Sequence, residues 1–239
     1  MPAYNEGLAL GPVLERLQRT LSELESRYRT ELIVVDDGSR DETSAVIDAF
    51  VLRFPQTRVS THATNRGLVE ALKTGVQAAS GEAVVMLDAD LSYAPEIVEP
   101  LVRTLFERRA QVVIASPYMP GGRVGNVPFD RLLASRCANW LLSTLVGGRI
   151  KTLTGMVRAY DAATIRTIVG RRIPGEFNAG VLAEILRTRG SIVEIPAALL
   201  WPPSRTDAPS RMTAAMLWRR LRLVMVTARG LLASVWATR

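Results

Sequence analysis

The sequence AVVMLDADLSY, residues 83–93, decides the fold and points to the site. Its first five residues are apolar and mostly β-prone, and Asp88 and Asp90 follow them directly. We therefore expect a buried strand that ends in two carboxylates. In open α/β sheets, ligands bind beyond the carboxyl ends of the strands, where a divalent cation carrying a diphosphate would fit between two aspartates. The alternative is a solvated acidic loop, because Asp-x-Asp is a short and common pattern.

Segments on either side of this stretch alternate between strand and helix patterns. Residues 31–35, ELIVV, predict a second buried strand, which runs into Asp36 and Asp37. This alternation favours an α/β fold with a mostly parallel sheet and helices on both faces. Because parallel strands share a direction, both acidic strand ends should lie at one edge. Further strands are expected at residues 58–61 and 111–115, and helices at residues 11–29, 41–54, 68–79 and 95–108.

The two ends of the chain depart from this alternation. A doubly wound fold usually opens with a strand, whereas residues 1–6 read as a loop, so we expect the first strand to be missing. Residues 1–211 should form one domain, and residues 212–239 a basic amphipathic helix. Between residues 116 and 211 we expect a loop rich in Pro and Gly, helices at residues 129–146 and 178–189, and extended segments at residues 152–160 and 191–200.

Charge is divided unevenly along the chain of 239 residues. Residues 1–120 hold 12 Lys and Arg against 17 Asp and Glu, a balance of −5, whereas residues 121–239 hold 18 against 6, a balance of +12. These balances suggest a metal-binding half and an anion-facing half. The single cysteine, Cys137, excludes an internal disulfide and a cysteine zinc site. The single histidine, His62, argues against a catalytic triad, and we expect both residues to be structural or incidental.

Four motifs together carry a resemblance to a known family. They are PAYNE at residues 2–6, VVDDGSRDET at residues 34–43, NRGLVEALKTGVQAASG at residues 65–81 and VVMLDADLSYAPE at residues 84–96. In order and spacing they resemble the family 2 glycosyltransferases of GT-A fold. Later segments are similar to the branch that contains dolichol-phosphate mannosyltransferase and bacterial polyprenyl-phosphate glycosyltransferases. Ser92, Pro117, residues 152–157 and Arg211 depart from that branch's commoner residues.

The resemblance implies roles for particular residues. Asp88 and Asp90 would coordinate Mg²⁺ or Mn²⁺ on the diphosphate of a GDP- or UDP-linked sugar. Arg131 and Ser135, four residues apart on one helical face, would bind the acceptor phosphate. An arginine further along the chain, Arg205 or Arg211, would lie near the diphosphate or acceptor. The nucleotide-sugar donor would contact Pro2, Tyr4, Glu6, Asp36, Asp37 and Asp88.

The acceptor decides what catalytic machinery is needed. A polyprenyl phosphate is already an anion near neutral pH, whereas a sugar hydroxyl would need a general base. The basic half offers few carboxylates as bases, with Glu176 and Glu184 as candidates, which favours a lipid-phosphate acceptor. The alternatives are transfer to a saccharide hydroxyl and a non-catalytic module that binds nucleotide or membrane. Nucleotidyl transfer fits less well, because PAYNE replaces the Gly-rich, Arg-containing loop that it usually requires.

Residues 212–238 combine arginines with Leu, Val, Met and Trp, a composition typical of a helix lying on a membrane surface. A packed helix with an arginine-rich outer face explains the pattern equally well. No apolar stretch near the C-terminus is long enough to span a membrane. We expect a cytoplasmic protein, with peripheral contact at the cytoplasmic face of the membrane. Nucleic-acid binding is not expected, because no aromatic-interleaved basic platform is present.

Overall fold

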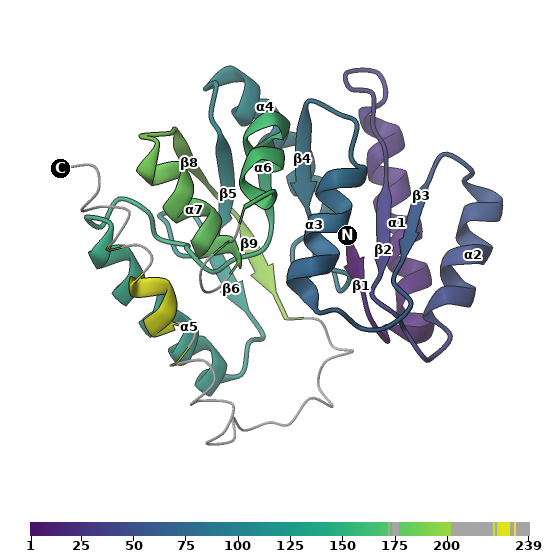
Figure 1. Ribbon diagram of the computed structural model, residues 1–239, viewed down its shortest axis with the longest axis horizontal. Coiled ribbons are helices and arrows are strands. Elements are labelled where there is room, and N and C mark those ends of the chain that lie inside the picture. The colour runs from purple at the N-terminus through teal and green to yellow at the C-terminus, as the bar shows by residue number, and fades with distance from the viewer. Residues whose placement is uncertain (172, 174–176, 202–221, 223, 230–231, 233–239) are drawn as a thin grey trace.

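The computed structural model describes residues 1–171, 173, 177–201, 222, 224–229 and 232 (Figure 1). Strands and helices alternate along the first half of the chain, as the sequence predicts. The strands are β1 (Pro2–Ala3), β2 (Ile33–Asp36), β3 (Arg58–Thr61), β4 (Ala83–Met86), β5 (Val112–Ser116), β6 (Arg123–Gly125), β7 (Arg158–Asp161), β8 (Ile192–Pro196) and β9 (Ala198–Leu200). The helices are α1 (Leu10–Leu24), α2 (Thr43–Arg53), α3 (Leu68–Ala78), α4 (Val98–Glu107), α5 (Phe129–Leu145), α6 (Ala162–Val169) and α7 (Phe177–Arg187), with 3-10 turns η1 (Gly7–Ala9) and η2 (Pro95–Ile97).

The strands form three groups. One sheet has the order β1-β2-β3 and is parallel throughout. A second has the order β4-β7-β5-β8, in which β7 runs antiparallel to both of its neighbours while β5 and β8 are parallel. Strands β6 and β9 form a small parallel pair. The expectation of a mostly parallel α/β fold is confirmed. Strand β7 lies at the end of the extended segment expected at residues 152–160, whereas β6 and α6 are additions that the sequence pattern did not define.

The inner strands of the main sheets are buried on both faces, as their apolar composition predicts. In β5, Val113 and Ala115 belong to one core cluster, whereas Val112 and Ile114 belong to a second cluster on the other face. The first cluster includes side chains of α1, α2 and α4, and the second includes side chains of α3, α5, α6 and α7. Figure 1 shows α3, α6 and α7 in front of the sheets and α1 behind them.

The prediction that the first strand is missing is wrong. Pro2 and Ala3 form β1, which pairs in parallel with Val35 and Asp36 of β2. The amine of Met1 extends this pairing by donating to the Ile33 carbonyl at 2.9 Å. A strand of only two residues was hidden from the sequence pattern, because periodicity needs a longer window than Pro-Ala provides.

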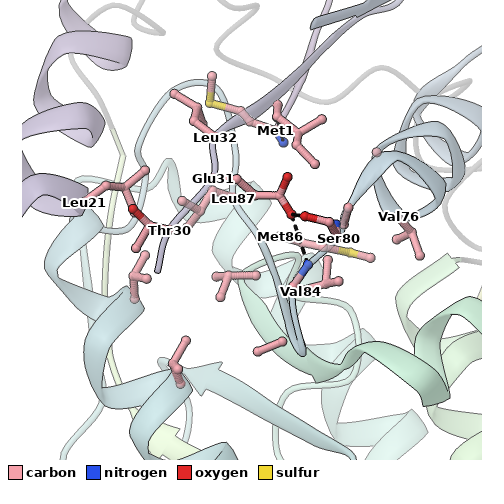
Figure 2. Close-up of a pocket in the computed structure, with 18 of the residues that line it drawn as sticks. Met1, Leu21, Thr30, Glu31, Leu32, Val76, Ser80, Val84, Met86 and Leu87 are labelled. Carbon is pink, nitrogen blue, oxygen red and sulfur yellow. Dashed lines mark hydrogen bonds between the residues drawn. The ribbon is translucent and has the colours of Figure 1, made fainter. Parts of the chain in front are cut away.

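A cavity of about 820 Å³ lies where β2 and β4 approach each other without pairing (Figure 2). Its walls are mostly apolar side chains of α1, β2, α3, β4 and α4. At its rim the Glu31 carboxylate accepts hydrogen bonds from the Ser80 backbone N–H, the Ser80 hydroxyl and the Gly81 N–H. Burial alone would raise the pKa of Glu31, but these bonds and the neighbouring Arg58 hold it below its usual range. Glu31 thus ties the start of β2 to the end of α3.

The C-terminal segment is described only in part. Residues 222, 224–229 and 232 are helical, and Val224 and Ala228 pack against the second core cluster. The rest of the segment predicted as a basic helix, at residues 212–239, lies outside the described residues. Within the described part of the chain, no helix is both long enough and apolar enough to cross a membrane.

A glycine in the wall of the cavity predicts a stabilising substitution. Gly75 lies inside α3, and a Cβ atom there would meet Val35 Cγ2 at 3.4 Å, an ordinary contact. Gly75→Ala should raise the free energy of unfolding by about 1 kcal/mol, because alanine favours the helix and fills part of the cavity. Urea denaturation measures this change.

Gly67, which precedes the same helix, provides the matched control. Its φ of +89° and ψ of 158° are accessible almost only to glycine. Gly67→Ala should therefore lower the free energy of unfolding by about 1–3 kcal/mol, although nothing lies within 4 Å of the added Cβ. A change of stability in the same direction for both substitutions would contradict the roles assigned to Gly75 within α3 and to Gly67 before it.

Candidate active site

The loop after β1 is attached to the loop after β2. The Asn5 backbone N–H donates to Ser39 Oγ at 3.1 Å, and Asn5 Oδ1 accepts from the Arg40 N–H at 2.9 Å. The fully buried Thr43 hydroxyl accepts from the N–H groups of both Glu6 and Gly7, at 2.8 and 2.9 Å. The structure therefore brings together the two segments that the sequence assigned to the donor. Tyr4 is 42% exposed at this junction, and Pro2 and Glu6 are partly buried.

Asp36 shapes the loop that follows β2. Its side chain is buried, and its Oδ1 accepts hydrogen bonds from the Ser39 N–H at 3.0 Å and the Ser39 hydroxyl at 2.6 Å. Its other oxygen accepts from the Ser44 hydroxyl in the first turn of α2. Asp36 thus fixes the loop that reaches Asn5, and contact with a donor would be an additional role.

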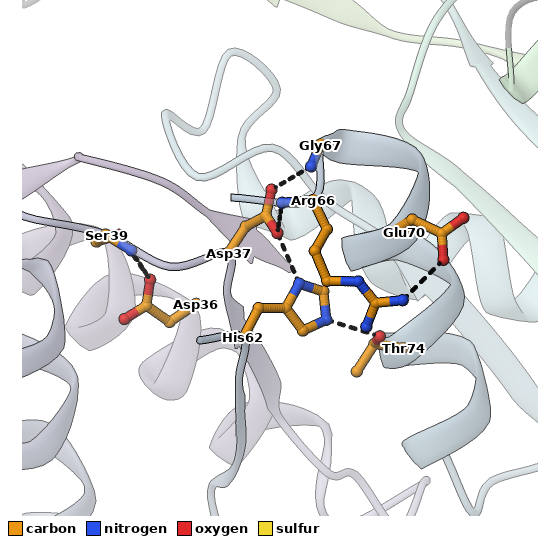
Figure 3. Close-up of polar contacts among 8 residues, drawn as sticks. All are labelled: Asp36, Asp37, Ser39, His62, Arg66, Gly67, Glu70 and Thr74. Atoms are coloured by element: carbon orange, nitrogen blue, oxygen red, sulfur yellow. Dashed lines mark hydrogen bonds and ion pairs between the residues drawn. The ribbon is translucent and has the colours of Figure 1, made fainter. Parts of the chain in front are cut away.

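Asp37 is the centre of a second polar network (Figure 3). Its buried carboxylate accepts from the backbone N–H groups of Arg66 and Gly67, at 2.9 and 2.8 Å, and lies 2.6 Å from His62 Nδ1. His62 Nε2 lies 2.9 Å from the Thr74 hydroxyl. A neutral imidazole satisfies both contacts when Nδ1 carries the proton. The expectation that His62 is structural agrees with this arrangement.

The hydrogen bonds to Asp37 stabilise its charged form. Burial alone would raise the pKa of Asp37, but the Arg66 N–H, the His62 side chain and the Gly67 N–H together hold it below its usual range. Asp37 therefore remains an anion while linking the end of β2 to the turn before α3.

Asp88 and Asp90 follow β4, as the sequence predicts. Both are partly buried, and Asp90 Oδ1 accepts from the Ser92 N–H at 2.9 Å and the Ser92 hydroxyl at 2.6 Å. Burial lowers the pKa of the Met1 amine to about 5, while the charge of Asp88 acts in the opposite direction. The end of β4 lies near β1, since Ala3 shares a core cluster with Leu87 and Ala89. No group of three or more potential His, Cys, Asp or Glu ligands occurs among the described residues, so a metal here would need further oxygen ligands.

Arg131 and Ser135 lie on α5 and are held by aromatic residues from other segments. The Arg131 guanidinium lies over the Trp201 ring, 5.0 Å from its centroid. The Tyr118 hydroxyl donates to Ser135 Oγ at 2.8 Å. The structure therefore fixes both residues predicted to bind an acceptor phosphate, through partners that the motif alone did not identify.

Asn139, one turn further along α5, attaches this helix to the loop at residues 152–155. Its Oδ1 accepts from the N–H groups of Leu153 and Thr154, at 2.7 and 3.2 Å. Its Nδ2 donates to the Ser135 carbonyl at 2.9 Å and to Thr154 Oγ1 at 3.0 Å. Because the buried amide uses both of its ends, it sets the position of α5 relative to the loop.

Arg158, in β7, holds the same loop through hydrogen bonds to its backbone. Its side chain is completely buried and donates to the carbonyls of Leu153, Gly155 and Asn178, at 2.6, 2.8 and 3.0 Å. A buried guanidinium is costly unless its donors are satisfied, so these three bonds are a strong constraint on the loop.

Tyr93 connects the two halves of the site. Burial raises the pKa of its hydroxyl above the usual range, and the nearby Asp88 and Tyr118 act in the same direction. A Cβ atom on Gly155 would lie 4.0 Å from the same hydroxyl. Tyr93 therefore lies near both Asp88 and the loop that Asn139 holds. Beside it, the Ser92 carbonyl accepts from the Leu200 N–H at 2.8 Å, which ties the segment after β4 to the strand that precedes Trp201.

The described residues do not include every predicted candidate. Arg205 and Arg211, proposed to lie near the diphosphate or acceptor, and Glu176, a candidate base, lie outside them. Glu184, the other candidate base, pairs with Arg187 at 3.0 Å on α7.

Comparison with protein families agrees with this arrangement. The model for "Glycosyl transferase family 2" matches residues 1–167. The chain belongs to glycosyltransferase family 2. This match covers the first-half motifs, the strand ends, Arg131 and Ser135, so the family assignment includes most of the candidate active site of this glycosyltransferase.

Its curated relatives include enzymes of lipid-phosphate glycosylation. The chain is 29% identical over 198 residues to dolichol-phosphate mannosyltransferase of Pyrococcus furiosus, covering 82% of this chain but 54% of that protein. It is 30% identical to polyprenol monophosphomannose synthase of Mycolicibacterium smegmatis, covering 82% and 74%. It is 29% identical to undecaprenyl-phosphate mannosyltransferase of Micrococcus luteus, covering 98% and 93%. The glycosyltransferase thus spans about half of the first relative and nearly all of the third.

Solved structures support the GT-A fold. Glucosyl-3-phosphoglycerate synthase from Mycobacterium tuberculosis in complex with UDP matches with a TM-score of 0.66 at 22% identity, covering 97% of this chain and 78% of that one. Another structure of that enzyme contains Mn²⁺, UDP and glucosyl-3-phosphoglycerate, and matches with a TM-score of 0.60 at 23% identity. At these identities the likeness concerns the fold alone.

The network around Asp37 predicts an acid-dependent loss of stability. The pKa of Asp37 in the folded protein lies below the ordinary value of 3.8. The stability that its charged carboxylate contributes is therefore complete above pH 3.8 and is lost as the pH falls through the folded-state pKa. Asp37→Asn should lower the free energy of unfolding at pH 7 by about 2–3 kcal/mol, because an amide cannot accept all three bonds.

The matched control is Asp48→Asn, which removes the same charge from the exposed surface of α2. Urea unfolding should show little change for this control at any pH. The difference in free energy of unfolding between the wild type and Asp37→Asn should become smaller below pH 3.8, because the wild-type carboxylate takes up a proton there and loses its charge. A deficit that stayed constant across the acid range would contradict the assigned role of the carboxylate charge.

Proposed function

We propose that this glycosyltransferase transfers a sugar from a GDP- or UDP-linked donor to a polyprenyl phosphate, with inversion and with the help of a divalent metal. The observation that carries the proposal is the contact between the segment after β4 and the one that holds Arg131: the Leu200 N–H donates to the Ser92 carbonyl at 2.8 Å, and the next residue, Trp201, lies beneath the Arg131 guanidinium. This contact supports a site in which Asp88 and Asp90 hold a metal diphosphate and Arg131 and Ser135 hold a phosphate. The relatives' names support the same acceptor class.

The chemistry of the first pair fits Mg²⁺ or Mn²⁺. Asp88 and Asp90 supply hard oxygen ligands, and Ser92 orients Asp90 through two hydrogen bonds. Such an ion usually keeps several positions for water and phosphate oxygens, which agrees with a site that has few protein ligands. When bound, it would neutralise the charge that develops on the leaving nucleoside diphosphate.

The second pair fits an anionic acceptor. Arg131 offers fixed donors to phosphate oxygens, and its stacking on Trp201 limits the conformations that must be frozen on binding. In the proposed step, an acceptor phosphate oxygen attacks the anomeric carbon, and the bond from this carbon to the nucleoside diphosphate breaks. No proton has to be removed from an ionised phosphate, so no general base is required.

Three carboxylates of the basic half that the structure describes have structural roles, which favours this acceptor over a sugar hydroxyl. Asp161 caps α6 by accepting from Thr164, and Glu194 accepts from the N–H groups of Lys151 and Thr152. Glu184 is paired with Arg187. These carboxylates stabilise the fold through those partners, which leaves them poorly suited to act as a base.

Asp90→Asn should abolish metal-dependent turnover while leaving the fold intact. The substitution keeps the shape of the side chain but removes the charge that would hold the ion, and a loss of at least about a hundredfold in kcat is expected. Transfer of radiolabelled sugar at increasing Mn²⁺ concentration measures this effect. Asp48→Asn serves as the control for charge alone, and full activity of Asp90→Asn would contradict the metal site.

Assays of the wild type and of Arg131→Gln should show whether the acceptor is a lipid phosphate or a sugar hydroxyl. A donor panel of GDP- and UDP-linked sugars is tested with polyprenyl phosphate and with a neutral saccharide. We expect transfer to the lipid phosphate, and a rise of about tenfold or more in its KM in the variant, because a charge-assisted contact is lost. Arg19→Gln, which removes the same charge from the exposed surface of α1, should leave KM unchanged. Transfer to the neutral saccharide alone would overturn the proposed acceptor.

A further inference from the structure

Helix α5 has an unusual distribution of side chains. Its buried residues include the polar Asn139 and Ser143 together with Leu142. Its outer face instead carries large apolar side chains: Phe129, Leu133, Trp140 and Leu141 are 77%, 50%, 70% and 42% exposed. A surface helix of a soluble domain normally has the opposite arrangement, with its apolar stripe facing the core.

The proposed active site accounts for the polar inner face. Ser135 and Asn139 point toward Tyr118 and the loop at residues 152–155, where their hydrogen bonds are made. It does not account for the outer face, because Phe129 and Trp140 are too exposed to support the fold. Exposed apolar side chains gathered along one helix mark a surface that contacts a partner or a membrane.

Basic residues accompany this apolar surface. Arg136 is exposed on the same helix, and Arg149 is exposed just after it. In the C-terminal segment, Arg222 and Arg229 are exposed beside Met225 and Val226, which are 50% and 42% exposed. The segment also packs on the core cluster that contains Leu142 of α5. Apolar side chains with Trp and a basic border are the composition of surfaces that lie in the headgroup region of membranes.

We propose that the outer face of α5, formed by Phe129, Leu133, Arg136, Trp140 and Leu141, docks on an anionic lipid bilayer. This inference rests on the proposed lipid-phosphate acceptor, which it would bring to the inner face of the same helix. A second copy of the chain is a poorer occupant, because a symmetric contact would bring the same arginines together. Anionic headgroups complement those charges and add attraction that weakens with salt.

The test is co-sedimentation with vesicles of phosphatidylcholine alone and of phosphatidylcholine with phosphatidylglycerol. The wild-type protein should bind the anionic vesicles, and binding should decrease with added salt. Phe129→Ser combined with Trp140→Ser should reduce the partition coefficient by about tenfold or more, since two large apolar groups no longer enter the bilayer. Arg136→Glu should weaken binding to anionic vesicles specifically.

The matched control is Leu52→Ser combined with Phe106→Ser, at positions that are 85% and 46% exposed on α2 and α4. Helices α5 and α2 lie at opposite ends of the molecule in Figure 1, so the control should bind vesicles like the wild type. Circular dichroism checks that each variant is folded. Equal binding by the α5 variant and the wild type would overturn the proposal, as would an absence of wild-type binding.

Two further measurements separate this proposal from its alternatives. Light scattering reports self-association, and a dimer that only the α5 variant disperses would assign the face to a second copy. Transfer to a short-chain, water-soluble polyprenyl phosphate should persist in the α5 variant. Vesicle binding by a wild-type protein that shows no such transfer would contradict the proposed function and leave the docking surface standing.

Discussion

Burial of the inner strands on both faces of the sheets is the constraint on which the structure depends. Strands such as β5 place apolar side chains in both core clusters, so they have no position for a charged group within the sheet. Most charged groups therefore lie where a strand leaves the core, and the buried Arg158 of β7 is tolerated because three carbonyls accept its hydrogen bonds. Asp36 and Asp37 at the end of β2, and Asp88 and Asp90 after β4, occupy such positions. The location of the candidate site is thus a consequence of how the sheets are buried.

Hydrogen bonds to backbone groups then give the site its shape. Asp37 fixes the turn before α3, Thr43 fixes the loop after β1, and Asn139 and Arg158 fix the loop at residues 152–155. Each of these side chains is buried and bonds to backbone atoms from another segment. A buried polar network is stable only when its hydrogen-bonding groups all have partners. The loops must therefore keep one particular arrangement relative to each other. The exposed face of α5 differs from these buried networks. Its apolar side chains do not support the fold, and we assign them to contact with a membrane surface.

Features that depend on local sequence pattern were predicted from the sequence. The apolar segments before Asp36 and Asp88 are strands, and Arg131 and Ser135 lie on one helix. The two-residue β1 was missed because it is too short for a periodic pattern. The extended segment expected at residues 152–160 contains most of β7, but its antiparallel direction was not predicted, because the direction of a strand depends on distant pairing. Asn139 and Trp201 were not identified as partners, since their contacts join residues from different segments of the chain. Arg158 was not identified because nothing in the local sequence shows that its side chain is buried. Thr43 could have been found, because it belongs to the VVDDGSRDET motif.

The central claim is that the carboxylates after β4 anchor a metal diphosphate between the two halves of the site. Crystals of the protein with Mn²⁺ and a nucleoside diphosphate, measured for anomalous scattering of manganese, test it most directly. The account predicts one strong peak in contact with carboxylate oxygens of Asp88 or Asp90 and with phosphate oxygens, on the side that faces Tyr93. A nucleotide bound without a manganese peak at these carboxylates, or a peak elsewhere in the molecule alone, would contradict it.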